Sequence, residues 1–124
     1  MVKAIDYLCN LFTSEAMRKV TETEEVGDLI KWWHLEGRYK GREADEFLDI
    51  LDEAGVEKVI FSAWQIWSYR YKKLIMGPSI EEVAEHVAKC PDRFFGIYGI
   101  NPYKRMEGVR ELERAVKEYG FKGA

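Results

Sequence analysis

The chain has 124 residues and a mass of 14.5 kDa, which fits one domain but falls short of the roughly 250 residues of a closed eight-stranded βα barrel. With 47% hydrophobic and 33% charged residues, the composition is that of an ordered globular protein and excludes a disordered one. The formal net charge of −3 disfavours nucleic acid as a partner, because duplex binding normally needs a clustered basic surface.

Cysteine usage and the N-terminal residues bear on the compartment. Cys9 and Cys90 are far apart and fit neither a metal knuckle nor a disulfide framework, so both are expected to be small buried residues in a reducing environment. Asp6 interrupts the first apolar run too early for a signal peptide, and no run approaches the ~20 apolar residues of a membrane span. We therefore expect a soluble, cytoplasmic protein with no membrane partner.

The first expected element is a strand over residues 3–12. This stretch is almost continuously apolar, as in a parallel strand that is covered on both faces. Residues 13–42 then mix charges with apolar side chains and glycines, and Thr13 and Ser14 are candidate helix caps. The stretch 13–42 is interpreted as a partly helical, lid-like insertion within a single domain that covers residues 1–124.

The pattern becomes regular from Glu43 onward. A helix is expected up to Ala54, with Gly55 as its left-handed C-terminal residue, and a strand over residues 56–66 follows at once. Residues 68–77 combine tyrosines with basic side chains and predict a polar, aromatic loop. Such a loop after a strand is where βα proteins place functional residues.

Two further strand–helix signals complete the chain. Residues 79–82 (Ser-Ile-Glu-Glu) form a capping box that starts a helix, which Pro91 ends. A strand over residues 94–100 and a helix over residues 105–119 follow, and Phe121 begins another strand. The last helix is expected to face the core with five apolar residues, Met106, Val109, Leu112, Val116 and Tyr119. This alternation predicts an α/β fold, a partial (β/α) TIM-like barrel with parallel strands and flanking helices.

Four segments resemble the amidohydrolase-related family of metal-dependent barrel hydrolases, decarboxylases and hydratases. They are Ile5-Asp6, the run from Phe47 to Val59, the run from Cys90 to Gly96 and the run from Arg110 to Gly123. Their motifs are structural: an Ala-Gly-Val joint, a Pro-Asp-Arg-Phe turn and a Gly-Phe-Lys-Gly joint. The resemblance implies the N-terminal part of a hydrolase or carboxy-lyase that acts on a small, carboxylated substrate.

The resemblance also implies a divalent metal, zinc or manganese, in a complete member of the family. The family places a His-x-His pair after an aspartate at the end of the first strand, and here the two positions fall on Leu8 and Asn10. Leucine binds no metal and asparagine offers a weak neutral oxygen, so no metal site is expected in this chain alone. Asp6 either supports metal ligands, as in the family, or caps the strand end locally. The other ligands of the family come from later strands, so we expect an incomplete active site and assign no catalytic residue.

Barrels of this class build their pocket from residues at the carboxyl ends of the strands. Here these residues are Asn10, Trp64, Gln65 and Asn101. They are either substrate-binding residues or an aromatic core rim with polar loop caps. His34, between two apolar residues of the insertion, is a further candidate for the pocket, whereas His86 is expected at an ordinary surface or groove position.

Two alternatives to an incomplete enzyme remain open. One is a non-catalytic binding or assembly module on the same scaffold, with the tryptophan-rich insertion around Trp32 and Trp33 as its contact surface. The other is a complete flavodoxin-like sandwich, which the chain length permits. In the barrel interpretation, unpaired edges at the first strand and at Phe121, or exposed aromatic residues, predict a homo-oligomer.

Overall fold

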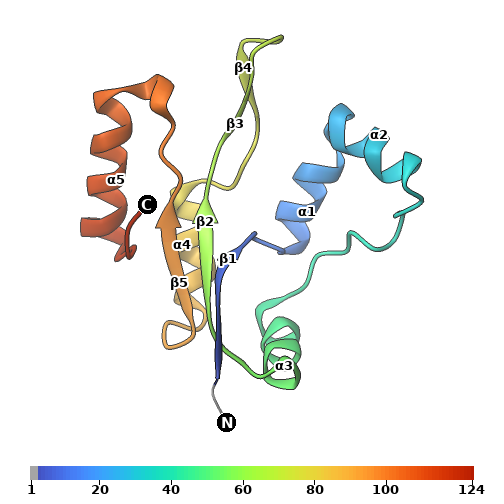
Figure 1. Cartoon of the computed structure of the whole chain (residues 1–124), viewed down its shortest axis with the longest axis vertical. Helices are drawn as coiled ribbons and strands as arrows, with labels where there is room; N and C mark the ends of the chain where they lie inside the picture. Colours follow the sequence, from blue (N-terminus) through green and yellow to red (C-terminus); the bar gives the residue numbers. More distant parts are fainter. Residues whose placement is uncertain (1–2) are drawn as a thin grey trace.

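A computed structural model describes residues 3–124, so Met1 and Val2 lie outside the described residues. Figure 1 shows the arrangement of its helices and strands. In chain order these are β1 (Ala4–Cys9), α1 (Ser14–Thr21), α2 (Glu24–Trp32), α3 (Ala44–Ala54), β2 (Val56–Ala63), β3 (Ile66–Ser68), β4 (Lys73–Met76), α4 (Ile80–Ala88), β5 (Phe94–Tyr98), the short 3₁₀ helix η1 (Pro102–Lys104) and α5 (Met106–Tyr119).

The main sheet has three parallel strands in the order β1-β2-β5. Cys9 lies opposite Phe61 in the first pair, and Ala63 lies opposite Tyr98 in the second. The α/β class with parallel strands and flanking helices is therefore confirmed. The flavodoxin-like alternative is wrong, because that fold places the first strand between the next two, whereas here β2 lies in the middle.

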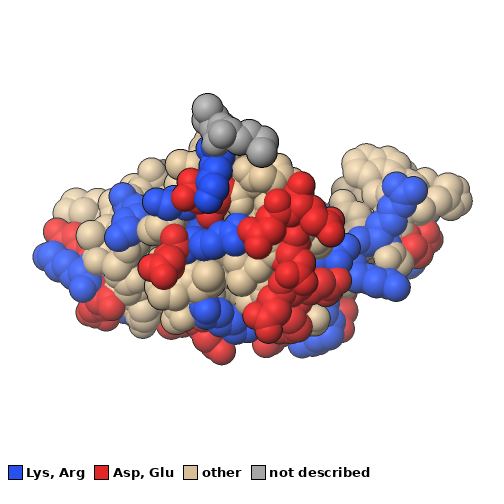
Figure 2. All heavy atoms as spheres, turned by 90° about the horizontal axis from the view of Figure 1, so that it is seen from below, with Lys and Arg blue, Asp and Glu red and all other residues tan. Residues whose placement is uncertain are grey.

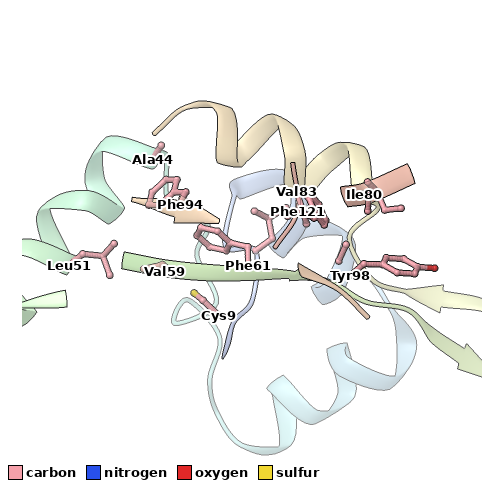
Figure 3. Close-up of a cluster of buried hydrophobic side chains, with 13 residues drawn as sticks. Cys9, Ala44, Leu51, Val59, Phe61, Ile80, Val83, Phe94, Tyr98 and Phe121 are labelled. Carbon is pink, nitrogen blue, oxygen red and sulfur yellow. The ribbon is translucent and has the colours of Figure 1, made fainter. Parts of the chain in front are cut away.

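The core lies between the sheet and the helices α3, α4 and α5 (Figure 3). Val59 and Phe61 of β2 and Phe94 and Tyr98 of β5 are 0–2% exposed. The rings of Phe61 and Phe94 meet edge to face with their centroids 5.2 Å apart. Each such buried side chain stabilises the fold by roughly 1.5–3 kcal/mol relative to an exposed position, so this face of the sheet holds the domain together.

Local signals in the sequence set the ends of the helices. Gly55 after α3 and Gly120 after α5 both adopt left-handed conformations, with φ of 72° and 69°. Ser79 and Glu82 form the expected capping box at the start of α4, in which each side chain accepts the other residue's backbone N–H. Thr13 caps α1 by accepting a hydrogen bond from the amide of Ala16 at 3.2 Å. These predictions are confirmed.

The first strand is shorter and far more exposed than expected. It spans Ala4–Cys9, and Ile5, Tyr7 and Leu8 are 57%, 74% and 63% exposed. These exposures show that the prediction of a strand covered on both faces is wrong, and among residues 3–124 only β2 pairs with β1. An apolar edge strand of this kind is normally paired or covered in a finished protein.

The stretch 68–77 is not the simple loop that its polarity indicates. β3 and β4 form an antiparallel hairpin, and the amide of Tyr71 donates to Ser68 Oγ at 3.0 Å within its turn. β-Branched and aromatic residues at the base, such as Ile66 and Trp67, favour strands and outweigh the polar tip. Only the part around the turn matches the prediction.

The inner face of α5 also differs from the expected stripe. Gly108 and Ala115 are buried and Leu112 and Tyr119 are half-buried, whereas the other three predicted residues, Met106, Val109 and Val116, are 64%, 40% and 42% exposed. A Cβ on Gly108 would lie 3.2 Å from the carbonyl oxygen of Asn101, so the helix turns this small residue toward the segment that follows β5.

The segment after α5 extends along β5 on the side opposite β2. The amide of Lys122 donates to the carbonyl of Gly96 at 2.8 Å, and the amide of Tyr98 donates to the carbonyl of Gly123 at 2.9 Å. The ring of Phe121 occupies the space where a side chain on Gly96 would lie. These contacts agree with the strand start that was expected at Phe121.

The α1–α2 segment and the β3–β4 hairpin project from the same end of the sheet, at the top of Figure 1. At the opposite end, acidic and basic side chains are interspersed, with acidic residues gathered near α3 (Figure 2). Asp49, Asp52 and Glu53 of α3 are exposed, as expected for a solvated helix face. Within residues 3–124, no helix has the length and apolar character that a membrane crossing requires.

Candidate functional site

Four polar or aromatic residues meet where the parallel strands end. Asn10 follows β1, Trp64 and Gln65 follow β2, and Asn101 follows β5. Trp64 Nε1 donates a hydrogen bond to Asn10 Oδ1 at 3.1 Å. Asn101 Nδ2 donates to Gln65 Oε1 at 3.4 Å, a long contact. The strand-end group of Asn10, Trp64, Gln65 and Asn101 thus spans all three strands of the sheet.

Two glycines let the backbone close around Trp64. A Cβ on Gly77 would lie 1.9 Å from the Trp64 carbonyl oxygen, and the φ of Gly77 is 136°. Gly99 donates its amide to the carbonyl of Ala63 at 2.7 Å, and a Cβ there would meet Trp64 at 3.2 Å. Only glycine combines this φ with so close an approach, so Gly77 fixes the hairpin base beside the strand-end group.

The four residues differ in how much solvent they meet. Asn101 is 8% exposed, and its Oδ1 accepts a hydrogen bond from the amide of Tyr103 at 3.0 Å. Trp64 and Gln65 are half-buried, and Asn10 is exposed. The group therefore offers an aromatic ring, an indole N–H and carboxamides at a position that small molecules can reach. Such groups bind rings and fix carboxylates or hydroxyls by hydrogen bonds.

A polar trio that the sequence did not indicate, with one buried and two half-buried members, holds the end of β5. The hydroxyl of Tyr98 donates to the carboxylate of Glu111 on α5, and Lys104 Nζ lies 2.6 Å from the other oxygen of that carboxylate. Burial and the bond to Glu111 raise the pKa of Tyr98 well above its usual range. Burial opposes ionisation of Glu111, but the hydrogen bonds from Lys104 and Tyr98 outweigh it and lower the pKa of Glu111. The trio ties η1 and α5 to the strand end that carries Asn101.

The residues at the end of β1 do not fit a metal ion. Leu8 has no donor atom, and Asn10 Oδ1 already accepts the indole N–H of Trp64. Asp6 Oδ1 accepts the amide of Leu8 at 3.1 Å, which is the local capping role that was expected as one alternative. Across the described residues 3–124, no three His, Cys, Asp or Glu side chains lie close enough together to hold a metal.

The two histidines lie elsewhere. His34 is exposed just after α2, with a φ of 52°, and is not among the residues in contact at the strand ends. His86 is 4% exposed and packs against the rings of Phe61 and Phe94, so the prediction of a surface position is wrong. The alternative of a groove position agrees with the structure, because His86 lines a groove between α1 and α4. The helical periodicity of α4 predicts that His86 lies next to the apolar face and not on it. In the structure the rings of Phe61 and Phe94 reach beyond that face and cover His86 as well.

The chain resembles known proteins in its fold. No family model matches the chain, and no curated protein matches it. The solved structures that match the whole chain include three decarboxylases. A 2,6-dihydroxybenzoate decarboxylase in complex with 2,6-dihydroxybenzoate is 23% identical with a TM-score of 0.62, and one from Rhizobium is 22% identical with a TM-score of 0.59. A dihydroxybenzoic acid decarboxylase from Polaromonas sp. JS666, with bound manganese and the inhibitor 2-nitroresorcinol, is 28% identical with a TM-score of 0.59.

The chain shares the fold of these barrel decarboxylases. The resemblance that the sequence motifs predicted is thereby confirmed, as is the partial TIM-like barrel with parallel strands. The chain spans about two fifths of the length of the solved structures it matches, 38–39%. In such barrels the carboxyl ends of the strands form the active-site face, which is the end where the strand-end group lies.

Proposed function

We propose that this chain forms one wall of a decarboxylase-like barrel and lines its pocket for a small, carboxylated aromatic substrate. The observation that carries the proposal is that the whole chain matches decarboxylase structures while its strand-end group lies on the face that barrels use for catalysis. The matched structures hold 2,6-dihydroxybenzoate in one case and 2-nitroresorcinol in another, and both are small polar aromatic rings.

The strand-end group suits such a ligand chemically. The half-buried ring of Trp64 can stack on an aromatic ring, which is worth roughly 0.5–1.5 kcal/mol beyond its area burial. The long bond between Asn101 and Gln65 leaves the carboxamide of Gln65 free to turn toward a carboxylate or hydroxyl. In this proposal Asn101 is the fixed member, because burial and the amide of Tyr103 hold it in place.

In the same proposal, the active site is incomplete within these 124 residues. Leu8 and Asn10 supply no metal centre, so a hydrolase or carboxy-lyase would need metal ligands and an acid or base from other polypeptide. The exposed edge of β1 and the match to 38–39% of the decarboxylases support this view. Residues 13–42 would then act as a lid beside the β3–β4 hairpin.

Nuclear magnetic resonance of the four indole N–H groups tests the binding role. Titration with 2,6-dihydroxybenzoate should shift the Trp64 indole resonance, assigned by its loss in Trp64→Phe, and leave that of Trp67 unchanged as an internal control. Trp67 is 49% exposed on the hairpin and so reports any non-specific binding. If the Trp64 resonance stays still while the acid is raised to tens of millimolar, or if all four resonances move alike, the binding role is wrong.

A second candidate function is a non-catalytic assembly module. Trp32 and Trp33 are 80% and 63% exposed, and large exposed aromatic residues mark contact surfaces. On this alternative the chain forms a homo-oligomer through these tryptophans or through the edge of β1. Sedimentation of the wild type and of Trp32→Ser/Trp33→Ser distinguishes these two interfaces. The double variant should be a monomer if the tryptophans form the interface, and should still associate if the edge of β1 forms it. A monomer at all concentrations contradicts the assembly module.

The proposal includes a cytoplasmic location and a small-molecule partner, with no part for nucleic acid. Cys9 and Cys90 are both free thiols. Burial, helped by the charge of Asp6, raises the pKa of Cys9 to about 12, so its thiol is unreactive at neutral pH.

The interspersed charges at the lower end of the sheet in Figure 2 form no basic stripe that would follow a phosphate backbone.

A further inference from the structure

A separate cavity lies between α1, α3 and the segment that leads into α3. Its volume is about 480 Å³, within the usual range for small-ligand sites. Five apolar or aromatic residues line it, namely Phe12, Met17, Tyr39, Phe47 and Ile50. None of them belongs to the strand-end group, so a ligand here would be distinct from the substrate proposed above.

The chain builds one wall of this cavity through two close backbone contacts. Gly41 packs against the start of α1 so tightly that a Cβ would lie 2.1 Å from the Cα of Ser14. The amide of Arg42 donates to the carbonyl of Phe12 at 2.8 Å. Together these contacts hold residues 38–42 beside α1, where their side chains line the cavity.

The cavity wall is apolar and partly open to water. Met17 is 7% exposed, and the rings of Phe12 and Phe47 pack at a tilt of 50° with centroids 6.3 Å apart. Phe12, Tyr39 and Ile50 remain 38%, 42% and 37% exposed. A ligand with an apolar body would remove this surface from water at about 25 cal/mol per Å².

Three basic residues line the same cavity: Arg38, Lys40 and Arg42. Arg42, two residues before α3, is neutralised by an ion pair with Glu46 in the first turn of that helix. Among the described side chains, which do not include that of Glu25, no carboxylate lies at ion-pair distance from Arg38 or Lys40. Two cations with no ion-pair partner among these side chains therefore border an apolar cavity.

We propose that this cavity binds a small amphipathic anion, a molecule with an aromatic or alkyl body and one anionic head group. The body fills the space lined by Phe12, Met17 and Phe47. The head group lies at the mouth between Arg38 and Lys40, which supply the missing charge complement.

Two fluorescent probes of nearly the same shape separate the two parts of this proposal. They are 1-anilinonaphthalene-8-sulfonate, which is anionic, and N-phenyl-1-naphthylamine, which is neutral. The double variant Arg38→Gln/Lys40→Gln should bind the anionic probe about two- to thirty-fold more weakly, the range expected for the loss of two exposed ion pairs. Its affinity for the neutral probe should stay the same.

A matched control removes the same two residue types elsewhere. Arg70→Gln/Lys72→Gln on the β3–β4 hairpin loses one arginine and one lysine, which lie over the rings of Tyr71 and Tyr69 away from the cavity, and should leave both affinities unchanged. Ile50→Trp should fill the cavity and weaken the binding of both probes at least tenfold. Circular dichroism checks that each variant is folded.

Three results would overturn the proposal. If both double variants bind the anionic probe more weakly by the same factor, the effect comes from the overall charge and not from this cavity. Unchanged probe binding in Ile50→Trp would place the probes elsewhere on the molecule. Absence of probe binding, together with a change in sedimentation of Arg38→Gln/Lys40→Gln, would make the cavity an interface between copies of this chain.

Discussion

Replacing His86 by phenylalanine should remove a large part of the acid sensitivity of this fold. The imidazole of His86 is 4% exposed, with its ring stacked on Phe94 at 5.2 Å and edge-on to Phe61 at 4.8 Å. Its Nδ1 is buried and has no hydrogen-bond partner among the described residues. Folding therefore keeps this side chain neutral, because a buried imidazolium with no acceptor is costly.

The size of the effect follows from the pKa of His86. Burial, with a smaller contribution from the charge of Lys89, lowers this pKa from 6.5 to about 4, and Glu43 opposes the shift. Because the unfolded chain binds the proton at higher pH than the folded chain, stability falls as the pH drops from about 6.5 to about 4. At 1.36 kcal/mol per pKa unit, protonation of His86 in the unfolded chain lowers the free energy of unfolding by about 2 kcal/mol between pH 7.5 and pH 5.

Urea unfolding of the wild type and of His86→Phe at pH 7.5 and pH 5 measures this contribution. All other ionisable groups are the same in both proteins, so the difference between the proteins isolates His86. The free energy of unfolding of the wild type should fall by about 2 kcal/mol more than that of the variant between pH 7.5 and pH 5. At pH 7.5 the variant should be at least as stable, since phenylalanine leaves no unpaired nitrogen. Equal losses in the two proteins would refute the reasoning.

Three backbone and capping substitutions give further expectations, each measured by urea or thermal unfolding. Gly77→Ala should destabilise by about 3 kcal/mol or more, because its Cβ would collide with the Trp64 carbonyl at a φ that alanine avoids. Gly120→Ala, at a φ of 69° with open space around it, should cost about 1 kcal/mol, and a cost equal to that of Gly77→Ala would show that the collision is irrelevant. Ser79→Ala should cost about 1 kcal/mol through loss of the capping box with Glu82, and an unchanged midpoint would contradict that role.

The features that the sequence predicts well have causes within a few residues. Gly55 ends α3 and Ser79 starts α4 because left-handed backbone and side-chain capping are decided locally. The strand-end group is predictable for a different reason, the topology of the sheet. Parallel strands that alternate with helices bring their carboxyl ends to one edge, so Asn10, Trp64 and Asn101 had to lie near one another.

The features that the sequence does not predict depend on partners far along the chain. The bond between Asn10 and Trp64 joins residues 54 positions apart, and the contact between Tyr98 and Glu111 depends on the rotation of α5. His86 is buried by rings from two strands, which helical periodicity in α4 does not reveal. Leu8 has the character of a buried residue, yet it is exposed because β1 has a neighbour on one side only.

Release of carbon dioxide from 2,6-dihydroxybenzoate by the 124-residue chain, with Mn²⁺ present, most directly tests whether this chain is a pocket wall without its own metal chemistry. We predict no release above that of buffer and Mn²⁺ alone, because Leu8 and Asn10 stand where the related family is expected to place metal ligands. Turnover well above this background that is lost in Asp6→Ala would contradict the prediction.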